Sequence, residues 1–308
     1  MTVRLDFSGG RFSMDDQYFT KLSDEILGFF DDLSVDEVLI NGTSSVCLVT
    51  GGRYALRSVP FQSPVELAVW CQTWARRQGV RLDPLVGAIG GSFQGHDYRW
   101  HSVLPPIAPD GPLFSLRRHR FNALDIHSFA LTAAQILAIK AAMMRRANLL
   151  ICGPTGCGKT SILAALLRAF AADERVIIVE SLAELPLPTP YSVRLIERQA
   201  NLEQIGGVGL ERLLRESLRL RPDRLVVGEV RGPEARVLCE ALMSGHGGVL
   251  ATMHAGSPAE AVAKLRFLAG MSTFTSPSQR WEGAAIEVLQ MQRGAPPHVE
   301  SLTREVLV

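Results

Sequence analysis

The sequence has few cysteines, little net charge and no long apolar run, and each shortage excludes a class of protein. Its 308 residues include five cysteines, none of them in a C-x-x-C pair, so we expect reduced thiols and no zinc site. The 32 basic and 31 acidic side chains give a net charge of +1, which provides no overall field for nucleic acid or anionic lipid. The longest uncharged run, residues 241–259, is interrupted by glycine, proline and histidine and is a poor membrane span.

The first residues, MTVRLDFSGGRFSMDD, have neither an apolar core nor a cleavage site. We therefore expect no signal peptide, no long leader domain, and only peripheral contact with a membrane. The composition, 47% apolar and 20% charged, is that of an ordinary globular protein. A chain of this length is expected to form about two domains.

Residues 1–121 have the pattern of a small α+β domain. Apolar residues at helical spacing predict helices over residues 16–30 and 64–78. Short alternating runs predict strands over residues 35–40, 46–50, 54–59, 98–104 and 113–116. We interpret residues 122–129 as a linker and residues 130–308 as a second domain.

In the second domain, apolar strands alternate with amphipathic helices. The expected strands are 148–152, 176–179, 225–228 and 249–252, and the expected helices are 159–171, 210–220, 233–243 and 258–268. This alternation predicts an α/β domain with a doubly wound, mainly parallel sheet. Residues 285–292 and 300–308 are expected to add edge strands.

The segment GPTGCGKT matches the phosphate-binding pattern G-x-x-x-x-G-K-[ST] between an apolar strand and a helix. Its backbone N–H groups and the helix N-terminus favour phosphate, Lys159 supplies a positive charge, and Thr160 offers a hydroxyl to Mg²⁺. We therefore expect ATP and Mg²⁺ as ligands. The residues expected to hold the nucleotide are Gly153, Pro154, Thr155, Gly156, Cys157, Gly158, Lys159, Thr160 and Ser161.

Cys157 lies inside this loop. A thiol among oriented N–H groups is expected to have a lowered pKa and some reactivity. The alternative is that Cys157 is a small filling residue without a chemical role.

Two apolar strands end in a carboxylate. The run LVVGE ends at Glu229 and fits a Walker B element, whose acid holds Mg²⁺ or orients the attacking water. The run VIIVE ends at Glu180, with Glu184 one helical turn later, and Glu180 is a second candidate to polarise the water. A solvated acid at the end of a strand is the alternative for Glu180.

Two histidines, His246 and His254, flank the strand that follows, and composition alone assigns them no role. In order along the chain, GPTGCGKT, VIIVESLAEL, RPDRLVVGEVRG and GHGGVLATMHAGSPAEA resemble four motifs of the type II/type IV secretion and type IV pilus ATPase superfamily. These motifs are Walker A, the Asp box, Walker B and the His box. SVDEVLINGTSSVCLVTGGR and HSVLPPIAPDGPLFSLRR resemble the N-terminal domain of the same family. SLRLRPDRLVVGEVRGPEA and PPIAPDGP are most similar to its Tad pilus (CpaF-like) and VirB-type branch.

The resemblance implies a RecA-like P-loop ATPase domain preceded by the α+β domain. It implies that Thr160 and Glu229 bind the metal, that Arg117 and Arg118 reach the nucleotide, and that the two histidines link nucleotide state to neighbouring segments. The catalytic residues implied in this way are Glu180, Glu229, Arg117, Arg118, His254 and His246. Arg194 and Arg198 match weaker basic positions after the Asp box. The sequence departs from the family by having Ser181 where an aspartate is common.

The resemblance also implies an ATP-hydrolysing motor subunit that works as a homo-hexamer. It would be cytoplasmic, peripheral at the inner-membrane face, and would act on platform proteins of a secretion or pilus system. One alternative is a RecA-like nucleic-acid motor, which the near-neutral charge and the lack of a basic, aromatic-rich stripe disfavour. The other is a non-catalytic, ATP-binding regulatory paralogue, which the intact Lys159, Thr160, Glu180 and Glu229 disfavour.

Overall fold

The chain, described here from a computed structural model, divides into two compact units, Met1–His119 and Arg120–Val308. The structure describes residues 4–6, 11–43, 45–93, 98–118, 124–198, 206–270, 285–294 and 296–306. Within these ranges, no helix combines the length and the apolar character that a membrane span requires.

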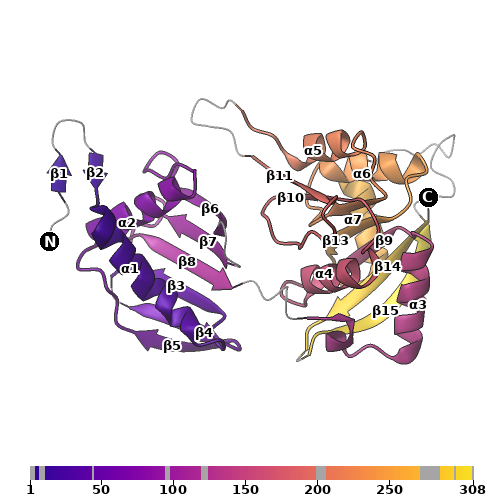
Figure 1. Cartoon of the computed structure of the whole chain (residues 1–308), viewed down its shortest axis with the longest axis horizontal. Helices are drawn as coiled ribbons and strands as arrows, with labels where there is room; N and C mark the ends of the chain where they lie inside the picture. Colours follow the sequence, from indigo (N-terminus) through magenta and orange to yellow (C-terminus); the bar gives the residue numbers. More distant parts are fainter. Residues whose placement is uncertain are drawn as a thin grey trace. The chain divides into compact units, whose positions relative to one another are not determined.

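The N-terminal unit is built on an antiparallel sheet. Among its described residues the sheet has six strands, in the order β5-β4-β3-β8-β7-β6 (Figure 1). These strands are β3 (Glu37–Asn41), β4 (Val46–Thr50), β5 (Arg53–Arg57), β6 (Ala88–Phe93), β7 (Tyr98–Val103) and β8 (Leu113–Arg118). A separate hairpin pairs β1 (Arg4–Asp6) with β2 (Arg11–Ser13). The helices of the unit are α1 (Asp16–Gly28), α2 (Pro64–Arg77) and the short 3-10 turn Phe29–Asp31.

An aromatic core joins α2 to this sheet. Ser63 caps α2 by accepting a hydrogen bond from the N–H of Glu66, and the helix directs two tryptophans inward. The ring centroids of Trp70 and Trp74 lie 4.7 and 5.3 Å from that of Phe114 on β8, edge to face. The core explains why both helices of this unit follow the apolar periodicity of the sequence.

The C-terminal unit contains a mainly parallel sheet. Its described strands follow the order β11-β10-β12-β13-β9-β14-β15, and only β15 runs antiparallel to its neighbour. The strands are β9 (Leu149–Gly153), β10 (Val176–Glu180), β11 (Val193–Ile196), β12 (Arg224–Val227), β13 (Val249–His254), β14 (Ala285–Gln292) and β15 (His298–Val306). The helices are α3 (Ala133–Met144), α4 (Lys159–Phe170), α5 (Leu210–Ser217), α6 (Glu234–Met243) and α7 (Pro258–Leu268).

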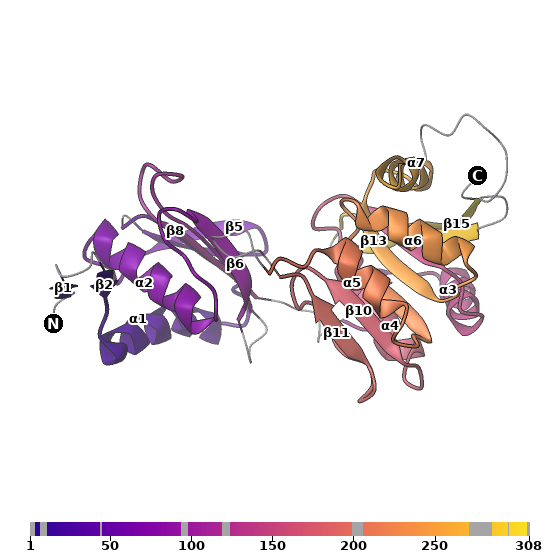
Figure 2. The same ribbon diagram turned by 90° about the horizontal axis from the view of Figure 1, so that it is seen from above.

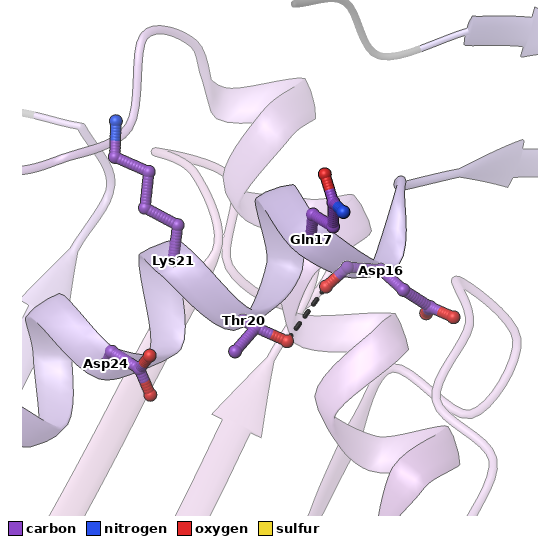
Figure 3. A pocket seen from close by; sticks show the side chains of 5 residues that line it. All are labelled: Asp16, Gln17, Thr20, Lys21 and Asp24. Atoms are coloured by element: carbon purple, nitrogen blue, oxygen red, sulfur yellow. Dashed lines mark hydrogen bonds between the residues drawn. The ribbon is translucent and has the colours of Figure 1, made fainter.

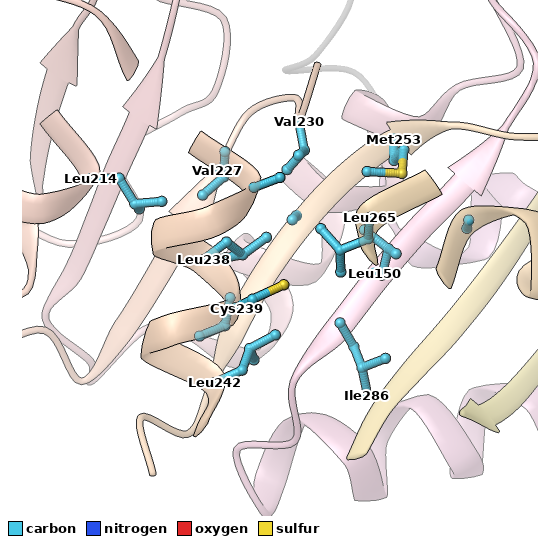
Figure 4. Packing of buried hydrophobic residues seen from close by; sticks show 14 of the residues in the cluster. Leu150, Leu214, Val227, Val230, Leu238, Cys239, Leu242, Met253, Leu265 and Ile286 are labelled. Atoms are coloured by element: carbon cyan, nitrogen blue, oxygen red, sulfur yellow. The ribbon is translucent and has the colours of Figure 1, made fainter. Parts of the chain in front are cut away.

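Helices cover both faces of this sheet. One buried cluster joins α5, α6 and α7 to one face, with Leu238 and Leu242 of α6 lying over the strands (Figure 4). The other cluster joins α3 and α4 to the opposite face. The expected doubly wound, RecA-like α/β fold with a smaller α+β domain before it is therefore confirmed (Figure 2).

The described part of the expected linker differs from the expectation. Residues 126–129 form a 3-10 helix in which Ile126 and Phe129 are buried in the cluster under α4. A guanidinium nitrogen of Arg168 on α4 donates to the carbonyl of Leu124. This segment therefore packs as part of the C-terminal unit because its apolar side chains complete that core. Residues 122 and 123 lie outside the described residues.

Candidate active site

The phosphate-binding loop connects the end of β9 to the start of α4. Because β9 lies between β13 and β14, the loop is at the middle of the carboxyl edge of the sheet, where ligands bind in open α/β folds. Gly153 has a φ of +152°, and a Cβ there would come within 2.5 Å of the Met291 carbonyl and 2.6 Å of the Cys157 sulfur. Only glycine fits this position.

Lys159 is buried at the base of the loop. Its Nζ donates to the carbonyls of Gly153 (3.1 Å) and Pro154 (2.8 Å), and it lies 3.1 Å from Nδ1 of His254. Burial lowers the pKa of Lys159 below its ordinary value. These two loop carbonyls fix the position of the ammonium group.

His254, the last residue of β13, lies between Lys159 and Glu229. An ammonium group only donates hydrogen bonds, so Nδ1 of His254 is the acceptor and its proton is assigned to Nε2. This Nε2 atom lies 2.9 Å from Oε1 of Glu229. Burial, and then the charge of Lys159, lowers the pKa of His254, which favours the neutral ring. A continuous polar chain thus joins Lys159 of the loop to Glu229, the expected Walker B acid.

Glu229 follows β12 and is partly exposed toward this edge. Arg231 donates to its Oε2 atom, so the carboxylate is shared between an arginine and a histidine. The hydroxyl of Thr252 on β13 donates to the carbonyl of Gly228 at 2.6 Å, which fixes the backbone just before the acid. Arg231 was not among the predicted site residues, although it stands two residues after the acid in the sequence.

Glu180 ends β10, the strand beside β12, and is nearly inaccessible, with 3% of its surface exposed. Its Oε2 atom accepts hydrogen bonds from the N–H groups of Glu184 and Leu185, both at 3.1 Å. Its Oε1 atom lies 2.7 Å from Nε of Arg194. Burial outweighs these favourable contacts and raises the pKa of Glu180 to about 7.

Comparison with known proteins identifies the family. The family model described as type II/IV secretion system protein matches residues 97–292. The chain belongs to this family. The expected fold and the expected ATPase activity are confirmed: the chain is a P-loop ATPase of the secretion motor class.

Individual relatives agree with this assignment. Putative conjugal transfer protein Rv3659c of Mycobacterium tuberculosis is 37% identical over 82% of this chain and 75% of its own length. Conjugal transfer protein TrbB of Rhizobium radiobacter is 31% identical over 80% and 76%. Two solved structures have a TM-score of 0.63. The Legionella pneumophila ATPase DotB is 19% identical, and the match covers 92% of this chain and 79% of DotB. The pilus retraction motor PilT is 16% identical, and the match covers 92% of this chain and 82% of PilT. Similarity to the Tad pilus branch stays a prediction.

Thr160 and Ser161 lie in the first turn of α4 and are half-buried. The Thr160 hydroxyl and the partly exposed Glu229 carboxylate are hard oxygen donors of the kind that Mg²⁺ prefers. Oε1 of Glu229 faces Nε2 of His254 at 2.9 Å and Oε2 accepts from Arg231, so a bound metal ion or its water would share this carboxylate with those two side chains. These residues fit the Mg²⁺ that a secretion ATPase uses with its nucleotide.

The structure does not bring His246 to this site. His246 precedes β13, whereas the phosphate-binding loop follows β9, and these two strands are parallel. His246 therefore lies at the amino edge of the sheet, the opposite edge from the loop. Its N–H donates to the carbonyl of Ala241, and Nδ1 is buried without a partner among the described residues.

Arg117 and Arg118 lie on β8 of the N-terminal unit. Arg118 donates to the carbonyl of Phe30, and its guanidinium carbon lies 5.1 Å from the centroid of that ring. Arg117 is exposed. A contact between either arginine and a nucleotide stays a prediction of the secretion ATPase resemblance.

Cys157 differs from the expectation. The side chain is 1% exposed, and burial raises the pKa of its thiol above the ordinary value. Loss of hydration outweighs the favourable charge of Lys159 and the local N–H groups. The prediction of a lowered pKa and a reactive thiol is therefore wrong, and Cys157 is a buried filling residue.

A further polar contact reaches the loop from β14 and was missed by the sequence analysis. Nε of Arg293 donates to the carbonyl of Thr155 at 2.9 Å. In the sequence, Arg293 is visible only as a basic residue just after a predicted edge strand. Its contact with the loop follows from the position of β14 beside β9, which the local sequence does not indicate. In the same region, a Cβ on Gly158 would come within 3.2 Å of Pro297.

A shallow depression on α1 carries none of this chemistry. Its lining residues are Asp16, Gln17, Thr20, Lys21 and Asp24 (Figure 3). All are exposed side chains of one helix, and Thr20 donates back to the carbonyl of Asp16 at 2.8 Å. It is an ordinary solvated helix surface in the N-terminal unit.

Proposed function

We propose that this secretion ATPase is a subunit of a hexameric ring in a bacterial secretion or pilus assembly machine. In this proposal, ATP turnover drives motion between the two units, and that motion acts on platform proteins at the inner membrane. The observation that most supports ATP turnover is the polar chain from Lys159 of the loop through His254 to Glu229. The relatives named for conjugal transfer and the structural likeness to PilT support the assignment to a secretion or pilus assembly machine.

The chain's own residues bind and orient the nucleotide. Lys159 moves from the carbonyls of Gly153 and Pro154 to the β- and γ-phosphates, which satisfy its charge better than two neutral oxygens. The loop N–H groups and the start of α4 hold the phosphate oxygens. Thr160 and Glu229 would hold Mg²⁺, which neutralises charge that develops on the phosphates.

His254 connects these groups. When Lys159 turns to the phosphates, Nδ1 of His254 loses its donor, while Nε2 still faces Glu229. The departure of the lysine charge raises the pKa of this histidine, because that charge is among the causes that lower it. We infer that His254 reports the position of Lys159 to the Walker B acid.

Glu180 is the base in this proposal. A carboxyl group with a pKa of about 7 is well matched to accepting a proton from water near neutral pH. It must first exchange its contact with Arg194 for the water. Arg117 supplies positive charge to the γ-phosphate from the N-terminal unit, and its exposure leaves it able to do so.

The test is ATP hydrolysis by the full chain, separated by mass into monomer and larger fractions. Lys159→Ala should remove activity, because the phosphate charge loses its partner, whereas Lys140→Ala, at an exposed position of α3, should not. Lysine-dependent turnover in a six-subunit fraction supports the proposal. ATP binding without turnover in any fraction contradicts it and favours a regulatory ATP-binding protein.

A further inference from the structure

Arg293 reaches the phosphate-binding loop from a distant part of the chain. It directly follows β14, which pairs in parallel with β9 so that Gln290 lies opposite Cys152. This pairing places Arg293 at the same sheet edge as the loop. The hydrogen bond from its Nε atom to the Thr155 carbonyl spans 138 residues of sequence.

The bond fixes the orientation of one peptide group of the loop. A trans peptide is planar, so the C=O of Thr155 and the N–H of Gly156 point in opposite directions. With the carbonyl held by Arg293, the N–H of Gly156 points away from Arg293. Within the described residues that N–H has no protein acceptor, and in a loop of this sequence pattern the backbone N–H groups receive phosphate.

Apart from the bond to Arg293, one long hydrogen bond of 3.5 Å, from the N–H of Cys157 to the carbonyl of Pro154, closes the turn around this peptide, and such a turn admits either orientation of its central peptide. Gly156 has a φ of +75°, and a Cβ built on it would meet nothing within 4 Å. Thr155 is exposed, and its hydroxyl lies 3.4 Å from Nδ1 of His254, a long contact. Because glycine adopts many backbone conformations and no atom packs where a Gly156 side chain would be, this peptide would sample several orientations without the bond to Arg293.

We propose that Arg293 is a positioning residue of the ATPase: it holds the Thr155–Gly156 peptide so that the Gly156 N–H faces the bound phosphates. The proposal rests on ATP binding at this loop. The rival explanation is that Arg293 acts only through its positive charge, which attracts the triphosphate from a distance.

Three substitutions separate the two explanations. In Arg293→Gln, the side-chain nitrogen is the same number of bonds from Cα as Nε of arginine, so the donor is kept and the charge is lost. In Arg293→Lys, the charge is kept but the nitrogen is one atom further out. Arg293→Met has similar reach with neither charge nor donor. Arg304→Met, at an exposed site of β15 near the opposite edge of the sheet, is the matched control.

The measurements are the Kd for ADP, the KM for ATP and kcat, at two salt concentrations. Arg293→Met should raise Kd and KM about tenfold, as expected for the loss of a charge-assisted hydrogen bond. The kcat should stay within about twofold, because the loop binds ground state and transition state alike. Arg293→Gln should stay within about threefold of the unaltered protein, and Arg304→Met should leave both constants unchanged.

Two results would overturn the proposal. One is an Arg293→Gln variant as weak as Arg293→Met while Arg293→Lys binds normally, which assigns the effect to charge. The other is an Arg293→Met variant with unchanged Kd and KM. Thermal unfolding of each variant shows whether it folds. If Arg293→Met does not fold, the comparison of Arg293→Gln with Arg293→Lys decides between the two explanations. Lys159→Ala tests ATP binding at the loop separately, so failure of the function is distinguished from failure of this proposal.

Discussion

Glu180 shows how burial and a single charge partner set the chemistry of one carboxyl group. Burial raises its pKa to about 7, and the charge of Arg194 acts in the opposite direction. Arg194→Gln removes that opposing charge, so the pKa of Glu180 should rise further. A base acts when deprotonated, so the rising limb of the kcat–pH profile should move to higher pH. Arg212→Gln, at an exposed site on α5, is the control, and an unmoved limb would show that Glu180 is not the base.

The five thiols should differ in reactivity according to burial. Cys157 is 1% exposed with a raised pKa, whereas Cys47 is only half-buried. Iodoacetamide at pH 8 should therefore label Cys47 at least about tenfold faster than Cys157, because the thiolate is the reactive form. Peptide mass mapping over time measures this. Equal rates for the two cysteines would contradict the burial argument.

At the scale of an element, the start of β12 is held by a buried ion pair. Arg224 is fully buried, and its Nη2 atom donates to Glu174 at 3.0 Å and to the carbonyl of Met143 at 3.1 Å. Arg224→Met leaves Glu174 with one partner fewer and should destabilise the C-terminal unit by about 3 kcal/mol. Scanning calorimetry measures the lower unfolding temperature.

The control for this prediction is a surface pair of similar chemistry. Arg236 and Glu240 form an exposed pair four residues apart on α6. Arg236→Ala should cost about 0.5 kcal/mol or less. A loss as large as that of Arg224→Met would mean that burial is not what gives the Arg224 pair its importance.

Elements were predictable where one contiguous stretch of sequence determines them. The buried strands β10 and β12 and the phosphate-binding loop have their residues in a single run, so their sequences alone indicate them. The strand β6 was missed because Gly90 and Gly91 weaken the alternating pattern. β11 was missed because Arg194 interrupts its short apolar run and none of its residues is fully buried, whereas β12, of the same length, is buried throughout. The contacts of His254 with Glu229, and of Arg293 with Thr155, depend on strand order, which no local pattern contains.

At the scale of the whole molecule, two units with separate cores allow effects on folding to be separated from effects on turnover. Arg118→Ala should lower the unfolding temperature of the N-terminal unit, because it loses the hydrogen bond to Phe30 and the contact with its ring. Arg117→Ala, at an exposed position, should leave that temperature unchanged.

If Arg117 reaches the nucleotide, the Arg117→Ala variant should reduce kcat about tenfold or more. A kcat equal to that of the unaltered protein would remove the arginine from the proposed mechanism.

The hydrogen bond from Arg293 to Thr155 also has a consequence for synthesis on the ribosome. Thr155 and Arg293 are separated by 138 residues, so translation delivers the loop long before the strand that places Arg293 beside it. Until β14 is made, β9 has its partner β13 on only one side, and the Gly156 peptide is unheld. A nascent chain that has not reached β14 should therefore gain little stability from ATP, and ligand-assisted folding of this unit should begin only after the last parallel strand has left the ribosome.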